Sequence, residues 1–293
     1  MQDHSDSYRE YLVAVKKVSQ NTLDAYMRDV NHFCLYCSSK NINNAKEIDE
    51  NIINSYITSL NRSVATTTRI TASLRNYFKF LINRGIVSSD PTHGIKSKKA
   101  EKHLPDILES DEIVKLLAQP NGDDYKSIRD KAMLELMYAT GIKVTELIEL
   151  TVNDLNLQIG ILNMHNTRHE RIVPIYPEAA RHLNEYLKNV RPAIVLDINE
   201  DRLFTNMSGQ PLSRQGLWKI IKYYAEKAGI NKDITPHTLR HSFATHLLEN
   251  GAKLSDIKEM LGHSDISSTQ VYAQFVKNKY VNAYAKFHPL AKR

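Results

Sequence analysis

The sequence predicts a mainly α-helical protein of two domains with one small antiparallel sheet. Residues 7–84 follow a helical pattern without a single glycine or proline, since the first of these are Gly85 and Pro91. Residues 96–105 are polar and rich in lysine, as is typical of a linker. A length of 293 residues with 42% hydrophobic content suffices for two cores. We therefore expect domains over residues 1–95 and 106–293.

The N-terminal domain should end in an amphipathic helix over residues 63–86. Its apolar positions recur at helical spacing: Ile70, Leu74, Phe78 and Leu81. Basic residues stand between them: Arg69, Arg75 and Lys79. This basic face is either a solvated surface or a surface that meets DNA phosphates, and the segment alone favours the solvated interpretation.

The C-terminal domain combines helices with a short sheet. A helix is expected after Ser110 as N-cap, and a longer one from about residue 127 to Gly141, where glycine suits a helix end. Between residues 154 and 176 short apolar runs flank a polar turn, which predicts an antiparallel pair of strands. Helical patterns return from Leu217 onward.

Charge and terminal sequence narrow the class of partner. Lys and Arg outnumber Asp and Glu by 39 to 33, giving a net charge of +6 and a pI near 9.1, which favours a polyanion such as nucleic acid. The N-terminus lacks a secretory pattern, and no apolar run is long enough to span a bilayer. We therefore expect a cytoplasmic protein.

The sequence does not favour a bound metal or other cofactor. Cys34 and Cys37 have C-x-x-C spacing, but no second pair completes a zinc site, so we interpret them as reduced thiols on a helix. His237 and His241 are four residues apart, but His246 would stand roughly 180° around the same helix from His237. A metal site at any of these residues is disfavoured.

The segment 235–241 reads Thr-Pro-His-Thr-Leu-Arg-His. It predicts the start of a helix that carries candidate functional side chains. Thr235 suits the N-cap and Pro236 the first helical position. His237 and Arg240 then share a face near the helix N-terminus, whose dipole and free N–H groups favour an anion. A phosphate is the expected ligand.

A second segment follows the same helix. Residues 254–263 predict an amphipathic helix with Ser255 as N-cap and Gly262 as terminator, and Gly262 turns His263 out of the helix path. Tyr272 stands nine residues later. Each residue alone would be ordinary, whereas the ordered set is hard to explain without a shared function.

These segments resemble the tyrosine recombinases, or phage integrase family, and within it the Xer-like members. His-Thr-Leu-Arg-His-Ser-Phe-Ala-Thr-His-Leu-Leu at 237–248 resembles the family's H-x-x-R box. Leu-Gly-His-Ser-Asp-Ile-Ser-Ser-Thr-Gln-Val-Tyr at 261–272 resembles its histidine and nucleophile box. Residues 138–147 resemble the box of the first catalytic arginine, and residues 63–91 the end of the N-terminal domain.

The resemblance covers nearly the whole chain and implies an architecture. Residues 1–95 would form a SAM-like core-binding domain and residues 96–105 a basic linker. Residues 106–293 would form an α-rich catalytic domain whose C-terminal tail, from about residue 275, packs against a neighbouring protomer. The expected partner is double-stranded DNA carrying a specific recombination site, bound by four protomers across two sites, with a partner recombinase or a DNA translocase as further candidates.

The resemblance also implies a mechanism without metal, ATP or other cofactor. Tyr272 would attack a phosphodiester, forming a 3′-phosphotyrosyl bond and releasing a 5′-hydroxyl, and the reverse attack would rejoin the strands. Arg240 and His263 would hydrogen-bond the non-bridging oxygens, while His237 would position the phosphate and exchange protons near the nucleophile.

Two positions depart from the family pattern. Lys143 stands where the family has its first arginine, so the charge is kept but the planar, two-pronged donor is lost. Residues 165–174 resemble the family's β-hairpin G-K-G-x-x-E-R-x-V-P, which places Asn166 where the family has a lysine that protonates the leaving oxygen. An amide cannot donate that proton usefully. His165, His169 or Lys143 could supply it instead.

Three functions remain open from sequence alone. The leading one is an active recombinase, either of the chromosome-dimer-resolving type or carried by a mobile element. The second is a DNA-binding paralogue that has lost strand cleavage through its altered positions. The third, a helical protein-interaction module, would show no affinity for DNA and no salt dependence.

Overall fold

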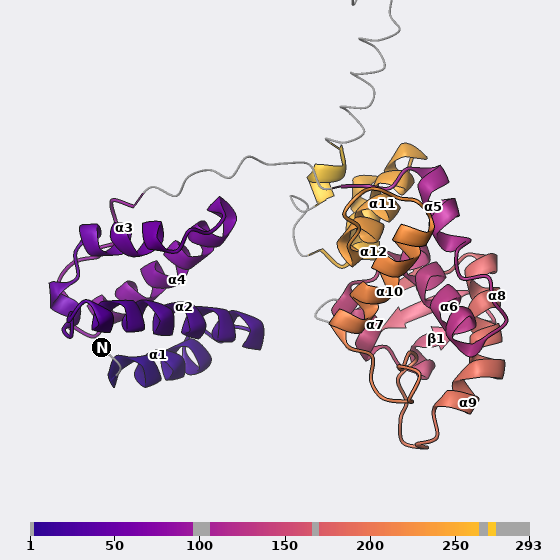
Figure 1. Ribbon diagram of the computed structural model, residues 1–293, viewed down its shortest axis with the longest axis horizontal. Coiled ribbons are helices and arrows are strands. Elements are labelled where there is room, and N and C mark those ends of the chain that lie inside the picture. The colour runs from indigo at the N-terminus through magenta and orange to yellow at the C-terminus, as the bar shows by residue number, and fades with distance from the viewer. Residues whose placement is uncertain (1–2, 96–105, 166–169, 264–268, 274–293) are drawn as a thin grey trace, which may run out of the picture. The chain divides into compact units, whose positions relative to one another are not determined.

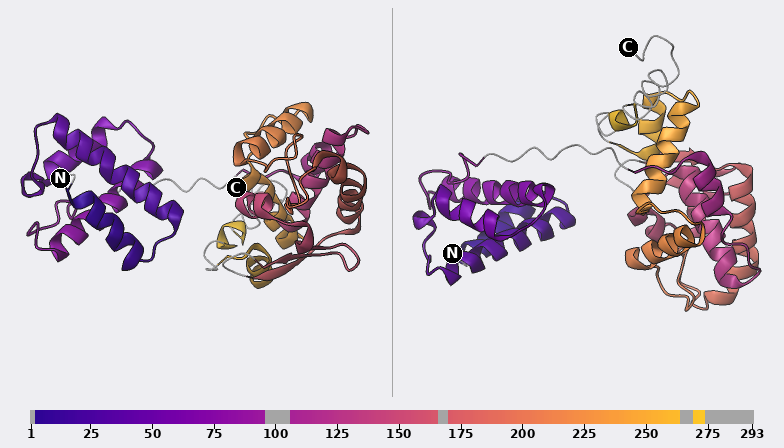
Figure 2. Two further views of the ribbon diagram at one scale, coloured as in Figure 1. Left: turned by 90° about the horizontal axis from the view of Figure 1, so that it is seen from below. Right: turned by 45° about the horizontal axis from the view of Figure 1, so that its top comes forward.

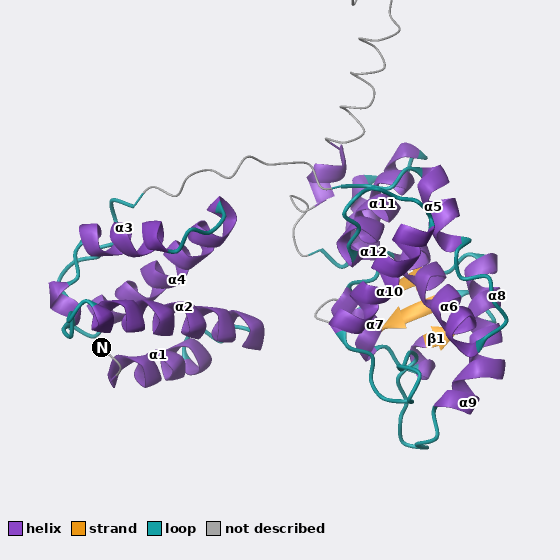
Figure 3. Cartoon of the chain, in the orientation of Figure 1, coloured by secondary structure: helices purple, strands orange, loops and turns teal. Residues whose placement is uncertain are grey.

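The computed structural model describes residues 3–95, 106–165, 170–263 and 269–273. Within it the chain divides into two compact units, residues 1–102 and residues 103–293, so the division falls within the lysine-rich segment 96–105. Each unit has a hydrophobic core of its own. The mainly helical class with one small antiparallel sheet is confirmed (Figure 3).

The described part of unit 1, residues 3–95, is built from four α-helices and one 3₁₀ turn (Figure 1). The elements are α1 (Asp3–Ala14), α2 (Gln20–Ser39), η1 (Ala45–Glu47), α3 (Glu50–Ser59) and α4 (Val64–Asn83). The apolar stripe predicted for α4 is buried along its whole length, from Ile70 to Leu81. Cys34 and Cys37 are buried free thiols on α2, and burial raises the pKa of the Cys37 thiol to about 12.

The basic residues of α4 have different surroundings. Arg69 donates to both oxygens of the buried Asp29 on α2, which also accepts a hydrogen bond from Ser73 at 2.7 Å. This buried carboxylate therefore fixes α4 against α2. Arg75 and Lys79 are exposed, and the Arg75 guanidinium reaches backbone carbonyls at residues 92 and 95 at 3.4 Å.

Unit 2 is organised around α6, whose residues are buried along most of its length. Its α-helices are α5 (Ser110–Leu117), α6 (Tyr125–Thr140), α7 (Val144–Glu149), α8 (Pro177–Glu185), α9 (Arg191–Ile194), α10 (Arg214–Lys227), α11 (Pro236–Glu249) and α12 (Leu254–Leu261). Two shorter helical turns are η2 (Val152–Asp154) and the π-helix η3 (Tyr186–Val190). No described helix has the length and apolar character needed to cross a membrane.

A three-stranded antiparallel sheet lies beside these helices. Its strands, in spatial order, are β1 (Leu155–Asn156), β2 (Ile161–Met164) and β3 (Arg171–Pro174). Leu162 pairs with Val173, and both side chains are buried in the core of unit 2. The predicted strand pair is confirmed, and the short β1 is an addition.

Two predicted N-caps are wrong by one or two residues, whereas the glycine stops are confirmed. Ser110 is the first residue of α5, because Glu109 caps the helix and its N–H donates to Glu112 at 2.8 Å. Lys253, not Ser255, precedes α12. Gly141 and Gly262 end α6 and α12 in the left-handed conformation, with φ of 58° and 61°.

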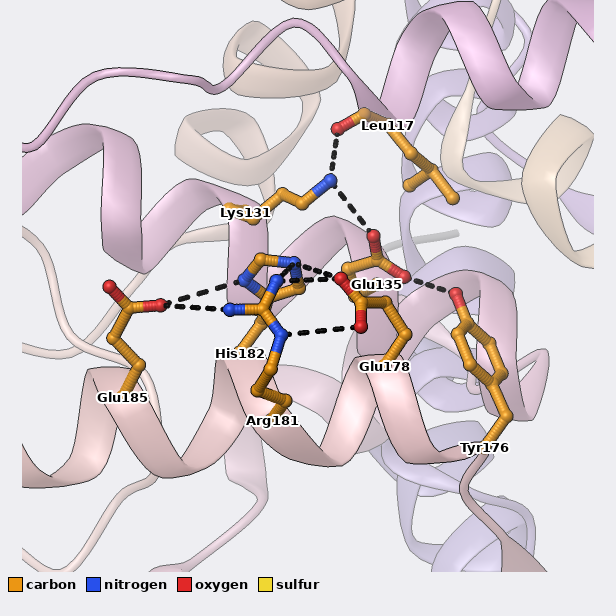
Figure 4. Close-up of polar contacts among 8 residues, drawn as sticks. All are labelled: Leu117, Lys131, Glu135, Tyr176, Glu178, Arg181, His182 and Glu185. Carbon is orange, nitrogen blue, oxygen red and sulfur yellow. Dashed lines mark hydrogen bonds and ion pairs between the residues drawn. The ribbon is translucent and has the colours of Figure 1, made fainter.

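A polar network ties α8 to α6 at the surface of unit 2 (Figure 4). The buried carboxylate of Glu135 accepts a hydrogen bond from the hydroxyl of Tyr176, which is the residue before α8. Lys131 pairs with the same carboxylate at 3.0 Å and donates to the Leu117 carbonyl at 2.6 Å. Exposed ion pairs lie along α8 beside this contact, including the pair of Arg181 with Glu178 at 2.6 Å (Figure 4).

Candidate active site

The helix start predicted at residue 235 forms as expected. Thr235 caps α11 by accepting the N–H of Thr238 at 3.3 Å, and Pro236 takes the first helical position. This start leaves His237 exposed and carries Arg240 inward, where it is only 4% exposed. α11 packs against both α6 and α12 (Figures 1 and 2).

Arg240 is held by the ends of two helices. One Nη donates to the Gly141 carbonyl after α6, and the other donates to the Leu261 carbonyl at the end of α12, at 2.6 Å. A Cβ at Gly141 would stand 2.5 Å from the Phe243 ring, so a glycine is needed for this approach. A guanidinium has five donors and can hold both carbonyls while also contacting a phosphate.

Burial lowers the pKa of Arg240 to about 10, against the raising effect of Glu146 and of Tyr272. The side chain stays cationic at neutral pH. A buried cation that is poorly solvated favours an anion arriving beside it. Arg240 therefore provides a fixed positive charge for a phosphate.

The carboxylate of Glu146 pairs with two further cations, Arg171 and Lys143. Arg171, on β3, donates to both oxygens of Glu146 at 3.2 and 2.9 Å and to the Met260 carbonyl at 2.7 Å. Glu146 also accepts the backbone N–H of Lys143 at 2.9 Å, in a capping box at the start of α7. Arg171 thus connects the sheet, α7 and α12 through contacts that already occupy its guanidinium.

The ammonium of Lys143 is held more loosely than Arg171. Its Nζ lies 3.8 Å from the nearer oxygen of Glu146, and its side chain is 40% exposed. Burial lowers the pKa of Lys143, and the neighbouring charges of Arg240 and Arg171 lower it further while Glu146 opposes them. Lys143 is therefore a cation that can turn toward a ligand and release a proton more easily than an ordinary lysine.

His263 faces the same charges from the end of α12. The left-handed Gly262 turns the chain there, and a Cβ at Gly262 would stand 2.8 Å from an Arg171 nitrogen. His263 Nδ1 lies 3.1 Å from the Thr269 hydroxyl. Burial, with Arg240 and Lys143 nearby, lowers the pKa of His263 to about 4, so the ring is neutral at pH 7.

Tyr272 lies in a short helical segment, residues 269–273, and is 1% exposed. Its ring packs with four apolar side chains of α11 and α12: Phe243, Ala244, Ile257 and Leu261. Its hydroxyl lies 3.0 Å from Nδ1 of His241. Burial raises the pKa of Tyr272, while Arg240 opposes that rise, so the phenol keeps its proton at neutral pH.

The expected site residues fall into two groups. Arg240 lies near both His263 and Tyr272, and Lys143 near His263, because their positive charges influence the pKa values of these groups. His237 is exposed on α11, and its ring centre lies 6.4 Å from that of His241.

Asn166 and His169 lie outside the described residues, and His165 is exposed at the end of β2. Among the residues that the structure describes, no group of three or more His, Cys, Asp or Glu side chains could hold a metal ion.

Sequence reasoning missed three residues of this site. Glu146 stands three residues after Lys143, and that spacing, typical of a capping box, could have identified it. Arg171 belongs to the hairpin pattern at 165–174, which gives it no role at the site. No local spacing connects His241 to Tyr272, which is 31 residues away.

Comparison with known proteins agrees with this arrangement. Residues 106–279 match the phage integrase family, and residues 6–85 match the phage integrase N-terminal SAM-like domain. The chain belongs to the phage integrase family.

Curated relatives extend the match over the full length. A tyrosine recombinase XerD of Staphylococcus epidermidis is 43% identical over 290 residues, covering 98% of each chain. One of Listeria innocua is 41% identical over 297 residues, covering 99% of this chain and all of the relative. The post-cleavage complex of the XerH site-specific recombinase with its difH substrate has the same fold, with a TM-score of 0.74, 22% identity and coverage of 96% of this chain and 84% of that one.

Proposed function

We propose that this site-specific recombinase cuts DNA with Tyr272 while Arg240, His263 and Lys143 hold the scissile phosphate. The supporting observation is convergence: four segments of unit 2 bring a phenol, two cations and a neutral imidazole together. Attack by the Tyr272 oxygen forms a 3′-phosphotyrosyl bond and releases a 5′-hydroxyl. The bond energy is kept, so attack by a 5′-hydroxyl of another strand rejoins the DNA.

The charges suit the transition state of this reaction. As the phosphorus becomes five-coordinate, negative charge grows on its non-bridging oxygens, and fixed donors in a poorly solvated site stabilise that charge. Arg240 is buried and already fixed by two carbonyls, so it reorganises little. His263 is neutral and donates a single hydrogen bond, and Lys143 contributes the second positive charge.

The exposed face of α10 supports DNA binding by unit 2. Its residues combine positive charge with aromatic surface: Arg214, Trp218, Lys219, Lys222 and Tyr223. The Lys222 ammonium lies 5.1 Å from the centre of the Trp218 ring. Lysine and arginine bind backbone phosphates without regard to sequence. We assign this face to the DNA duplex.

Lys143 and Asn166 should slow this enzyme without abolishing its reaction. Replacing a two-pronged arginine by lysine loses about one charged hydrogen bond, on the order of 1.5 to 3 kcal/mol, or roughly ten- to a hundred-fold in rate. Asn166 gives no proton to the leaving oxygen. We assign that proton to Lys143, because its ammonium is loosely paired and its pKa is lowered.

The proposal extends to the way in which the protomers assemble on DNA. Residues 1–95 would contact DNA as a core-binding domain, joined by the linker 96–105 to the catalytic domain 106–293. Four protomers would act on two DNA sites, with the C-terminal tail packing against a neighbouring protomer. A partner recombinase or a DNA translocase would act with this assembly in cytoplasmic chromosome-dimer resolution, and a mobile-element integrase would work by the same chemistry.

A nicked suicide substrate tests the proposed function. Cleavage near the nick lets a short fragment escape and traps a protein–DNA adduct that survives denaturant. We expect the adduct with the wild-type protein and none with Tyr272→Phe. Tyr138→Phe is the matched control, because Tyr138 also donates or accepts a hydrogen bond with a histidine of α11, at 2.9 Å from His246.

Two outcomes would contradict the proposal. An adduct that persists with Tyr272→Phe would exclude Tyr272 as the nucleophile. A wild-type protein that binds the site and yields no adduct would instead be a DNA-binding paralogue that has lost cleavage.

A further inference from the structure

The hydroxyl of Tyr272 contacts His241, a histidine outside the set of residues proposed above to hold the phosphate. His241 follows Arg240 directly on α11 and lies one turn beyond His237. Its Nδ1 is 3.0 Å from the Tyr272 hydroxyl, and the two ring centres are 5.6 Å apart at an interplanar angle of 51°. The two rings are tilted rather than stacked, and their close contact joins a ring nitrogen to the phenol oxygen.

The protonation states give this contact a direction. Burial, together with His237 and Arg240, lowers the pKa of His241 to about 4, so the imidazole is neutral at pH 7. A neutral imidazole has one ring nitrogen that accepts and one that donates. Tyr272 keeps its proton, because burial raises the pKa of the phenol. In the tautomer with its proton on Nε2, Nδ1 accepts the phenol O–H, and this is the arrangement that proton transfer from Tyr272 requires.

We propose that His241 takes the phenol proton as Tyr272 attacks the phosphate and returns it when the strands are rejoined. The inference rests on the proposed function, in which Tyr272 is the nucleophile. In cleavage the Tyr272 oxygen bonds to phosphorus and its proton passes to Nδ1. The bond from phosphorus to the 5′-oxygen breaks, and that oxygen takes a proton from the Lys143 ammonium.

Rejoining reverses each of these transfers. The 5′-hydroxyl attacks phosphorus, its proton passes to the Lys143 amine, and the Tyr272 oxygen leaves and recovers its proton from Nδ1 of His241. Atoms and charges balance over one cycle without an added reactant. His241 contacts a reacting oxygen in both directions, which makes it a catalytic residue in this scheme.

The surroundings of His241 connect its basicity to the presence of DNA. His237 and Arg240 face it from its own helix, Tyr272 from the segment after α12, and His263 from the end of α12. Without DNA the cation of Arg240 opposes formation of an imidazolium. A phosphate bound to Arg240 and His263 offsets that cation, so His241 becomes a better base once substrate is in place.

Two substitutions separate proton transfer from simple positioning. Asparagine at position 241 can place an amide oxygen near the position of Nδ1, and so can accept the phenol hydrogen bond but cannot take the proton. Phenylalanine removes both functions and keeps the ring. We expect His241→Asn and His241→Phe to slow adduct formation similarly, by roughly a hundred- to ten-thousand-fold, which is the usual contribution of general base catalysis.

Chemical rescue gives a readout that a structural role would not produce. Replacing Tyr272 by a fluorinated tyrosine whose phenol ionises near neutral pH removes the need for a base. In this background His241→Asn should cost less than about ten-fold. With ordinary Tyr272, the His241→Asn rate should rise with pH up to the phenol pKa, whereas the wild-type rate should be flat above pH 7.

The matched control is His246→Asn, which alters the same kind of contact elsewhere on α11, between a histidine Nδ1 and the Tyr138 hydroxyl. It should leave both the rate and the pH profile unchanged. Filter binding of the same DNA, and unfolding followed by fluorescence of Trp218 in α10, check that each variant folds and binds.

Each outcome has one meaning. If His241→Asn cleaves at the wild-type rate, His241 only positions Tyr272 and the inference is wrong. If fluorination fails to rescue a folded, DNA-binding His241→Asn variant, proton transfer is not what the substitution removed, and the inference is again wrong. If adducts form in Tyr272→Phe, the proposed function itself fails, independently of His241.

Discussion

Arg171 and Lys143 share the carboxylate of Glu146 unequally, and this decides what each can do. Arg171 holds both oxygens within 3.2 Å, whereas Lys143 approaches one of them at 3.8 Å. An arginine with its fork occupied is a structural residue. A lysine with a lowered pKa and a loose partner can contact a phosphate and act as an acid.

Lys143→Arg tests that division of roles. Arginine improves the phosphate clamp but cannot release a proton, so cleavage of ordinary DNA should slow by about ten-fold or more. A substrate with a 5′-phosphorothiolate leaving group needs no protonation, and on it the variant should match or exceed the wild type. The rates of adduct formation on the two substrates provide the measurement.

The double variant Lys143→Arg with Asn166→Lys is the control, because it moves the acid to the family's usual position. It should exceed the wild type on both substrates. A Lys143→Arg variant that is faster than the wild type on ordinary DNA would show that Lys143 is not the acid.

At the level of secondary structure, glycines and caps position the residues of the candidate site. Gly141 and Gly262 end α6 and α12 so that the Gly141 carbonyl and the neighbouring Leu261 carbonyl meet Arg240, and Gly262 also leaves room for Arg171. Both stops could be predicted from sequence, because glycine is favoured where φ is positive. The caps Glu109 and Lys253 could not, since the sequence offered serines with stronger intrinsic preference one and two residues later.

Gly262→Ala should disturb the active site through this element. The added Cβ would meet Arg171 at 2.8 Å, and a left-handed alanine is itself strained. We expect a loss of stability of about 1–2 kcal/mol and at least a ten-fold slower cleavage. Gly229→Ala is the control, because its φ is also positive, at 68°, and no atom lies within 4 Å of its Cβ position. Equal effects of both changes on cleavage would contradict the role given to Gly262.

The contact between α6 and α8 should contribute to the free energy of unfolding of unit 2. Tyr176→Phe removes the hydroxyl that donates to the buried Glu135 and leaves that carboxylate with Lys131 (Figure 4). Losing one hydrogen bond to a buried charge costs about 1–3 kcal/mol. Denaturant unfolding followed by Trp218, the only tryptophan in the chain, reports on unit 2. An unchanged midpoint would show that the network adds no stability, and adduct formation should be unaffected.

At the scale of the whole molecule, the histidines of unit 2 predict how stability depends on pH. The pKa values of His241 and His263 fall from 6.5 to about 4 on folding, and the pKa of His182 is also lowered, in each case chiefly by burial. The unfolded chain therefore binds more protons than the fold between these values. The free energy of unfolding should decline as pH falls from about 6.5 toward 5, above the range where carboxylates titrate.

Denaturant titrations between pH 5 and 7, followed by Trp218, measure this slope. His241→Phe removes one of the three groups and should make the slope shallower. A wild-type stability that is constant from pH 7 to pH 5 would contradict the buried, neutral state of these histidines.

DNA binding should carry the signature of phosphate contacts made by α10. The logarithm of affinity should fall linearly with the logarithm of salt concentration, and removing one phosphate-binding lysine should reduce the slope by about 0.9. Lys219→Gln and Lys222→Gln are expected to show this change. Lys115→Gln is the control, since Lys115 pairs with Asp111 on α5. Unchanged slopes in both α10 variants would show that this face of α10 does not contact DNA phosphates.

Sequence alone predicted the fold class, the core stripe of α4, the start of α11 and four of the residues that converge at the site. These features depend on local periodicity, capping and motif spacing. The contacts of Arg171 with Glu146 and of His241 with Tyr272 join residues 25 and 31 positions apart, and such pairs follow only from tertiary packing. The chemistry of Lys143 likewise depends on its neighbours more than on its residue type.

We propose above that Tyr272 is the residue that becomes joined to DNA. Its most direct test is to trap the adduct on a suicide substrate, digest the protein and the DNA, and locate the remaining nucleotide by mass spectrometry. We expect a 3′-phosphonucleotide on the peptide containing Tyr272 and on no other peptide. A nucleotide found on any other side chain, or joined through a 5′-phosphate, would contradict it.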